Sequence, residues 1–169
     1  MAGKAQDDAQ ASALTPGKGL VVLAIVIVAV AAFIAVSAAL GLAAVFGGFL
    51  FAFYFTGLCH AAPDKFLPAS VGAFVGMGIA FALMALPASF GTAGMIAALI
   101  VVLGAVYALI MGWAPMAINH ATMLFLTVGT IPALQQRGTL AEMALSAGLA
   151  VGLIGAALAV ARVRASKAV

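Results

Sequence analysis

Charged side chains are scarce in this sequence of 169 residues. Lys, Arg, Asp and Glu together make up only 7% of the chain, against about 25% in average soluble domains. A soluble globule could not cover its surface with so few polar groups, so that class is excluded. The composition is instead 67% hydrophobic, with a mean hydropathy of +1.32.

Cysteine and catalytic motifs are nearly absent as well. The single cysteine, Cys59, excludes an intramolecular disulfide framework and a cysteine-based structural zinc site. The chain has no nucleotide-binding loop, no paired catalytic carboxylates, no Ser–His–Asp arrangement and no c-type haem motif. We therefore expect neither an enzyme nor a cofactor, and this chain alone cannot be an ATPase.

The few charges leave long uncharged runs. No Asp, Glu, Lys or Arg occurs in residues 19–63 or 66–136, and Glu142 is the only charged residue in 138–161. Runs of this length and apolarity are typical of membrane spans. The sequence predicts an all-α helix bundle that has the lipid bilayer as its surroundings.

A count of spans at roughly 20 residues each predicts six transmembrane helices. The block 19–58 is long enough for two spans, with a break at Ser37 or Gly41. Further spans are predicted over 66–86, 93–113 and 115–134, with a sixth that ends near Ala161. The block 19–58 also fits an alternative of one long span followed by a re-entrant segment.

The basic residues orient the six spans. Six of the seven fall on the side that holds both termini, and Arg137 is alone on the other side; the six are Lys4, Lys18, Lys65, Arg162, Arg164 and Lys167. The positive-inside rule then predicts a cytoplasmic tail over 1–18, a membrane domain over 19–161 and a basic cytoplasmic tail over 162–169. Because the bases flank spans, the net charge of +3 does not indicate a nucleic-acid partner.

Two motifs bear on how the helices are arranged. Ser70-Val-Gly72-Ala-Phe-Val-Gly76 recurs 76 residues later as Ser146-Ala-Gly148-Leu-Ala-Val-Gly152, which suggests a 3+3 inverted repeat. The glycine pairs Gly72/Gly76 and Gly148/Gly152 are small-xxx-small patterns, which pack helices closely within one chain or between the copies of a homo-oligomer. Thr139-x-x-Glu142 has the form of a capping box that starts the last helix.

Polar residues at membrane depth are the candidates for function, because they are costly unless they have partners or line a wet cavity. The densest group lies in the predicted fifth span: Asn119, His120, Thr122, Thr127 and Thr130. One interpretation is a polar filter or protonatable gate. The other is that Asn119 and His120 hydrogen-bond neighbouring helices or lipid head groups.

An aromatic group surrounds the predicted end of the second span. Phe51, Phe55 and Tyr54 are candidates for a hydrophobic constriction, although aromatics near a span end commonly form an interfacial belt. Cys59, His60 and Asp64 are metal-ligand types, but three such residues in one loop without a repeat do not predict a metal site.

The block Gly47-Gly-Phe49-Leu-Phe51-Ala-Phe-Tyr54-Phe55, a polar loop with Lys65, and a Ser/Gly-rich span after it resemble a known family. It is domain-of-unknown-function family number 1097, a group of small bacterial inner-membrane proteins with five or six spans. The similarity in layout covers about 19–161, although this chain lacks the tryptophans usual in that family around spans two and three. That family has no established activity, so the resemblance implies a bacterial inner-membrane location.

Two functions remain open from the sequence. The first is a channel or transporter for a small neutral or weakly charged solute. The alternative is a non-transporting membrane subunit or substrate-binding component of a larger complex. Native purification separates the two, because a stoichiometric second protein favours a subunit and a homo-oligomer favours a channel.

Overall fold

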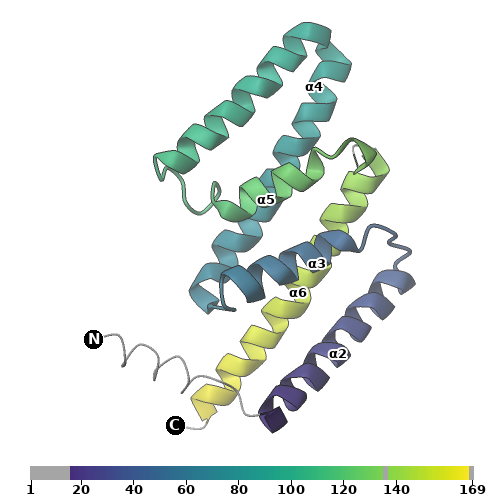
Figure 1. Cartoon of the computed structure of the whole chain (residues 1–169), viewed down its shortest axis with the longest axis vertical. Coiled ribbons are helices and arrows are strands. Elements are labelled where there is room, and N and C mark those ends of the chain that lie inside the picture. The colour runs from purple at the N-terminus through teal and green to yellow at the C-terminus, as the bar shows by residue number, and fades with distance from the viewer. Residues whose placement is uncertain (1–15, 135–136, 168–169) are drawn as a thin grey trace. The chain divides into compact units, whose positions relative to one another are not determined.

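The structure, a computed structural model, describes residues 16–134 and 137–167. Every regular element in these ranges is a helix, which confirms the predicted all-α class (Figure 1). The chain forms two compact parts, one that ends at Val36 and one that begins at Ser37, and each is described by itself. Most of the predicted tail 1–18 lies outside the described residues, and helix already begins at Pro16.

Helix α2, Pro16–Ala39, accounts for the first half of the long apolar block. It ends at the predicted break, where Gly41 has a φ of 69° that glycine adopts at little cost. Gly41 N–H donates to the Ala38 carbonyl and Leu42 N–H donates to the Ser37 carbonyl. This pair of hydrogen bonds is a Schellman motif, which satisfies carbonyls at the end of the helix.

Helix α4, Pro63–Ile110, doubles back on itself at Gly91 (Figure 1). Gly91 has φ 56° and ψ −134°, a conformation that strains any residue with a side chain. The two arms, 63–90 and 92–110, pack so closely after the turn that a methyl group at Gly94 would overlap the Leu86 carbonyl. The break predicted at residues 87–91 is therefore confirmed.

Two apolar helices are too short to cross a bilayer. Helix α3, Phe46–Phe53, has eight residues and continues into a five-residue π-helix, η1 (Tyr54–Leu58), while α5, His120–Gly129, has ten. At 1.5 Å per residue they extend roughly 20 Å and 15 Å, against about 30 Å of hydrocarbon. Within 19–58 the structure therefore contains one helix of spanning length, α2, and a second helical segment, 46–58, that is shorter than the full span predicted there.

The predicted helix over 115–134 is wrong in length for local reasons. Turns occupy residues before His120, where Gly112 and Ala114 have φ values of 65° and 51°. At the other end α5 stops at Gly129, and Pro132 opens a separate 3-10 helix, η2 (Pro132–Leu134). Turn-forming residues on both sides therefore shorten the helix to ten residues.

Helix α5 lies along the first arm of α4 on a row of small residues (Figure 1). The row follows i, i+4 spacing through Gly72, Gly76 and Ala80. A methyl group at Gly72 would overlap the Asn119 side chain, and one at Gly76 would overlap the Thr122 carbonyl. The glycines therefore let the two backbones approach closely, as small residues do in membrane bundles.

Helix α3 lies against α6, Arg137–Lys167, in a comparable way. Glu142 Oε2 accepts hydrogen bonds from Ala43 N–H and Ala44 N–H, each at 3.0 Å. Ser146, one turn further, accepts from Gly48 N–H at 3.2 Å and donates to the Ala44 carbonyl at 2.8 Å. Two side chains of α6 therefore satisfy the backbone at the start of α3.

This contact corrects the predicted capping box. Glu142 does bind free backbone N–H groups, but they belong to the segment before α3, about a hundred residues away in sequence. Thr139 lies inside α6, which begins at Arg137, and so it does not occupy the N-cap. The Glu142 carboxylate therefore binds backbone N–H groups far away in sequence and does not cap its own helix.

Aromatic rings fill the space between η1, α3 and the start of α4. Phe51 and Phe55 are fully buried and stacked, with ring centroids 6.2 Å apart. Phe66 meets Phe55 edge-to-face at 5.3 Å and Phe51 at 6.2 Å. These geometries are the favoured ones for aromatic pairs, so the cluster anchors the short helix to α4.

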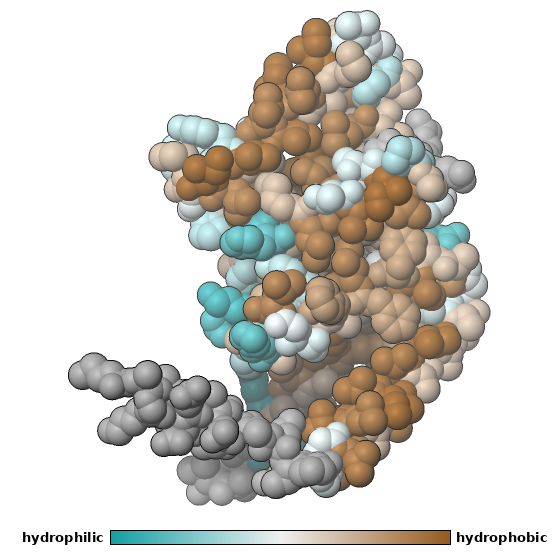
Figure 2. Space-filling model, in the orientation of Figure 1, coloured by the Kyte–Doolittle hydropathy of each residue, from teal (hydrophilic) through white to brown (hydrophobic). Residues whose placement is uncertain are grey.

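Three helices within the described ranges are long and apolar enough to cross a membrane: Gly19–Ala39, α4 and the 138–164 part of α6. They indicate a membrane protein, and Figure 2 shows apolar surface along the arms of α4. In chain order the segments are long, short, long, then long, short, long, when the arms of α4 are counted separately. Helix continues to Lys167, through most of the predicted C-terminal tail.

The packing of α5 on α4 predicts opposite behaviour for two glycines of one arm. Gly76→Ala places a methyl group against the α5 backbone, and overpacking of this kind costs about 1–3 kcal/mol. Gly78→Ala is the control, because no atom lies within 4 Å of a methyl group there. We expect thermal unfolding in detergent to show a lower midpoint for Gly76→Ala alone, and equal midpoints would contradict the packing.

Candidate functional site

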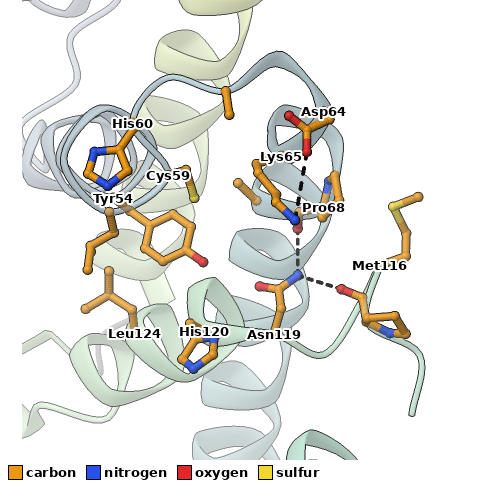
Figure 3. Close-up of a pocket in the computed structure, with 14 residues that line it drawn as sticks. Tyr54, Cys59, His60, Asp64, Lys65, Pro68, Met116, Asn119, His120 and Leu124 are labelled. Carbon is orange, nitrogen blue, oxygen red and sulfur yellow. Dashed lines mark hydrogen bonds and ion pairs between the residues drawn. The ribbon is translucent and has the colours of Figure 1, made fainter. Parts of the chain in front are cut away.

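An open cleft of about 1060 Å³ lies where η1 ends and where α4 and α5 begin (Figure 3). Its walls come from η1 and the loop 59–62, the first turns of α4, and the segment 115–124. Leu58, Pro68, Met116 and Leu124 give the cleft apolar walls, and polar side chains from three segments interrupt them. Figure 2 shows hydrophilic surface gathered beside the starts of α4 and α5.

The cleft collects every Asp, Glu, Lys, Arg or His side chain of a long apolar stretch. Between residues 19 and 136 the sequence contains only four residues of the Asp, Glu, Lys, Arg or His types. They are His60, Asp64, Lys65 and His120, and all four line this one cleft. Because such groups are expensive in a membrane protein, their convergence marks the cleft as the candidate functional site.

Asn119 holds the start of α5 against α4 in the wall of the cleft. Its Oδ1 accepts from Ala121 N–H at 2.9 Å and from Thr122 N–H at 3.4 Å, so it is the N-cap of α5. Its Nδ2 donates to the Pro68 carbonyl of α4 at 2.8 Å and to the Pro115 carbonyl at 3.1 Å. All four hydrogen-bonding positions of the amide are thereby used.

His120 and Tyr54 face the cleft from opposite walls. His120 is the first residue of α5, is exposed, and has no hydrogen-bond partner within the described ranges. Tyr54 opens the π-helix and is almost wholly buried, with its hydroxyl near the Cys59 side chain and the Ala121 backbone. Figure 3 shows this hydroxyl directed across the cleft toward the start of α5.

The charged pair at the start of α4 is weakly held. Lys65 Nζ and Asp64 Oδ2 are 3.8 Å apart, and the side chains are 62% and 73% exposed. Exposed pairs of this kind contribute only about 0–1 kcal/mol, so both groups can exchange partners easily. His60 lies across the cleft on the loop before α4 and has no hydrogen-bond partner in the part of the chain that the structure describes.

Backbone strain is concentrated in the loops that border the cleft. In the described ranges, non-glycine residues with positive φ are His60 (51°), Ala61 (53°) and Ala114 (51°). The π-helix adds an irregular turn in which Cys59 N–H donates to the Tyr54 carbonyl at 3.1 Å. Strained residues and π-helical turns both occur often at functional sites, which supports the assignment of the cleft.

The other residues predicted to line a pore lie elsewhere. Thr122 is fully buried and completes the capping box of α5, since its hydroxyl accepts from Asn119 N–H at 3.1 Å and donates to the Ala117 carbonyl. Thr127 and Thr130 donate to carbonyls of their own segment, Met123 and Thr127. Phe51 and Phe55 belong to the aromatic core described above, and the cleft wall does not include them.

The four glycines predicted to pack helices have different neighbours. Gly72 and Gly76 of α4 lie against α5. Gly148 of α6 faces the Phe74 ring of α4, while a methyl group at Gly152 would meet no atom within 4 Å. The two similar motifs therefore have different surroundings in this single chain.

The sequence placed the polar residues in two separate groups. His60 and Asp64 were assigned to one loop, and Asn119 and His120 to a span. A signal was available, because the six predicted spans would put the 59–66 and 113–115 connections on the same side of the bilayer. The structure brings the two groups together in one cleft.

Comparison of the chain with protein families, curated protein sequences and solved structures finds no match. The resemblance to family number 1097 therefore stays a prediction. The case for function depends on the geometry of the cleft and of the two short helices.

The bonds of Asn119 predict a graded series of stabilities. Asn119→Ala removes the cap and both amide donor bonds, of which the one to the Pro68 carbonyl is long-range, and the loss of an N-cap alone costs about 0.5–2 kcal/mol. Asn119→Ser keeps a capping oxygen, so we expect it to unfold between wild type and Asn119→Ala in detergent melts. Thr127→Val, which removes a bond within one helix turn, is the control, and a larger effect from it than from Asn119→Ala would refute this assignment.

Proposed function

We propose that this chain is a bacterial inner-membrane channel or transporter for a small solute, and that the cleft at the starts of α4 and α5 is its solute-binding site. The observation that carries the proposal is the convergence on one cleft of all four Asp, Glu, Lys, Arg or His side chains between residues 19 and 136. Loop strain and a π-helix at the same place support it. Asn119 holds the wall of the cleft, and His120 and Tyr54 face the solute.

The two short helices are further support for a solute path through the protein. Irregular or partial helices at membrane depth are tolerated where protein covers them or where they line a cavity. Here α3–η1 and α5 both border the cleft or pack on the long helices that do. In this proposal the four long segments cross the bilayer as continuous helices, and each short helix crosses it together with the non-helical residues beside it, which makes six crossings.

A 3+3 inverted repeat fits the order of these segments. A shift of 76 residues carries the arm 63–90 onto 139–166, inside α6, and carries α2 onto 92–115, which contains the second arm of α4. It also carries 46–58 onto 122–134, where α5 and η2 lie. Each short helix packs on the last long segment of the other half, as interlocked inverted repeats do around a transport site.

The proposed orientation places the cleft on the cytoplasmic side. The loops 59–62 and 111–119 both adjoin the cleft, in agreement with the basic asymmetry that assigns them to one side. Tyr107 and Trp113 are both exposed and pack edge-to-face at 5.4 Å, next to that loop. Exposed aromatics of this type are enriched at membrane interfaces.

A homo-oligomer, with contacts through faces such as that of Gly152, is part of the proposal.

A flux measurement tests the proposed function. Purified protein in proteoliposomes should carry small solutes such as urea, glycerol or short carboxylates faster than protein-free liposomes. His120→Ala, in the cleft wall, should change the rate severalfold, whereas Thr127→Val, outside it, should leave the rate unchanged. Absence of flux for all solutes would refute the channel, and co-purification of a stoichiometric partner would favour a subunit.

The single native cysteine tests the side on which the cleft opens. Cys59 lines the cleft and is partly exposed, so a membrane-impermeant maleimide should label it in inside-out vesicles and not in intact spheroplasts. Cys59→Ser is the control for nonspecific labelling. Labelling from the periplasmic side alone would reverse the proposed orientation.

A further inference from the structure

We infer that the cleft binds a small monocarboxylate with a short aliphatic chain. The inference rests on the proposed function, because it takes the same cleft as the solute site and names the chemistry of its ligand. Three features carry it: N–H donors on three side chains, a single exchangeable cation, and apolar walls around both (Figure 3).

Three side chains of the cleft carry free N–H donors. Lys65 has three N–H groups and no acceptor, and each of the two imidazoles has at least one N–H and, when neutral, one acceptor nitrogen. Asn119 offers the ligand nothing, because its amide is saturated by the backbone. Asp64 is the one carboxylate in the wall. A ligand head group that only accepts hydrogen bonds can therefore contact all three donor side chains.

Because the cleft wall has a single fixed cation, it favours a ligand with a single negative charge. Lys65 is the one fixed cation of the cleft wall, and Asp64 holds it across 3.8 Å in an exposed, weak pair. A ligand carboxylate can take the place of Asp64 beside the ammonium and form a charge-assisted hydrogen bond. The positive ends of α4 and α5 lie at the same cleft and add to the preference for an anion. A multiply charged anion would lack a second fixed cation.

The apolar walls indicate the chemistry of the rest of the ligand. Leu58, Leu124 and Met116 face the space from three different segments, and Pro68 and Pro115 complete the apolar surface. Short methylene chains gain affinity from burial against such a surface, whereas polyols and inorganic anions do not. The cleft therefore combines one cationic contact point with an apolar wall, which is the complement of a short fatty acid.

Equilibrium dialysis of radiolabelled butyrate against the full chain in detergent tests this inference without a membrane. Butyramide, which has nearly the same shape and no charge, is the matched ligand. We expect butyrate to bind at least about fivefold more tightly than butyramide, as follows from one weak charge-assisted contact. We also expect affinity to rise at least about twofold per methylene from acetate to butyrate.

Charge variants at the cleft give signed expectations. Lys65→Gln should weaken butyrate binding about fivefold, and Asp64→Asn should strengthen it, because the ammonium then loses its competing partner. Arg162→Gln removes a positive charge outside the cleft and should bind butyrate as wild type does. Both cleft side chains are exposed at the start of a helix, and size-exclusion profiles will check that the variants remain folded.

The failures of the two proposals are distinguishable. Equal binding of butyrate and butyramide, no binding of either, or unchanged butyrate affinity in Lys65→Gln would overturn the carboxylate assignment. If neutral solutes still cross proteoliposomes in that case, the channel proposal stands. If butyrate binds as expected and no solute crosses, the ligand class stands and the transport proposal is refuted.

Discussion

The structure depends on how the backbone is satisfied where two short helices begin among apolar segments. Free N–H groups at a helix start cost several kcal/mol each, on the order of a buried unpaired polar group, when neither water nor a side chain reaches them. Here Asn119 caps α5, and Glu142 and Ser146 accept hydrogen bonds from the backbone N–H groups at the start of α3 and just before it. The Asn119 amide and the two α6 side chains also tie the starts of the short helices to α4 and α6, so the caps fix tertiary contacts as well as helix ends.

These caps explain why the cleft is where it is. Asn119 ties the start of α5 to the Pro68 carbonyl, and Phe66 ties η1 to the start of α4. The space left between η1, α4 and α5 is the cleft, and the residues that turn the chain into these helices are the ones that line it. Strain at His60 and Ala114 follows, because the loops must reverse direction within a few residues. The polar side chains of the loops are thereby brought to one place.

Much of the fold could be predicted, and the failures share one cause. Hydropathy identified the membrane class, and glycine and proline marked the breaks at Gly41 and Gly91. Hydropathy could not tell a full span from a short helix with non-helical flanks, because residues 40–45 are as apolar as the helix that follows them. The capping box failed similarly, since Glu142 found a partner far away in sequence. For the candidate site, residue types were predicted at Asn119, His120 and Tyr54, while the role of His60, Asp64 and Lys65 beside them was missed.

The sequence by itself determined that this protein has the composition of a membrane protein, where its few charged residues lie along the chain, and which few residues are polar enough to matter. These properties depend on composition and order along the chain, and apolar transfer free energy is additive over residues. Only the tertiary structure decided which helices stop short, which polar side chains are consumed as caps, and which remain free in a cleft. Those outcomes depend on hydrogen bonds between segments 50 to 100 residues apart, such as Asn119 with Pro68 and Glu142 with Ala43, which no local pattern encodes.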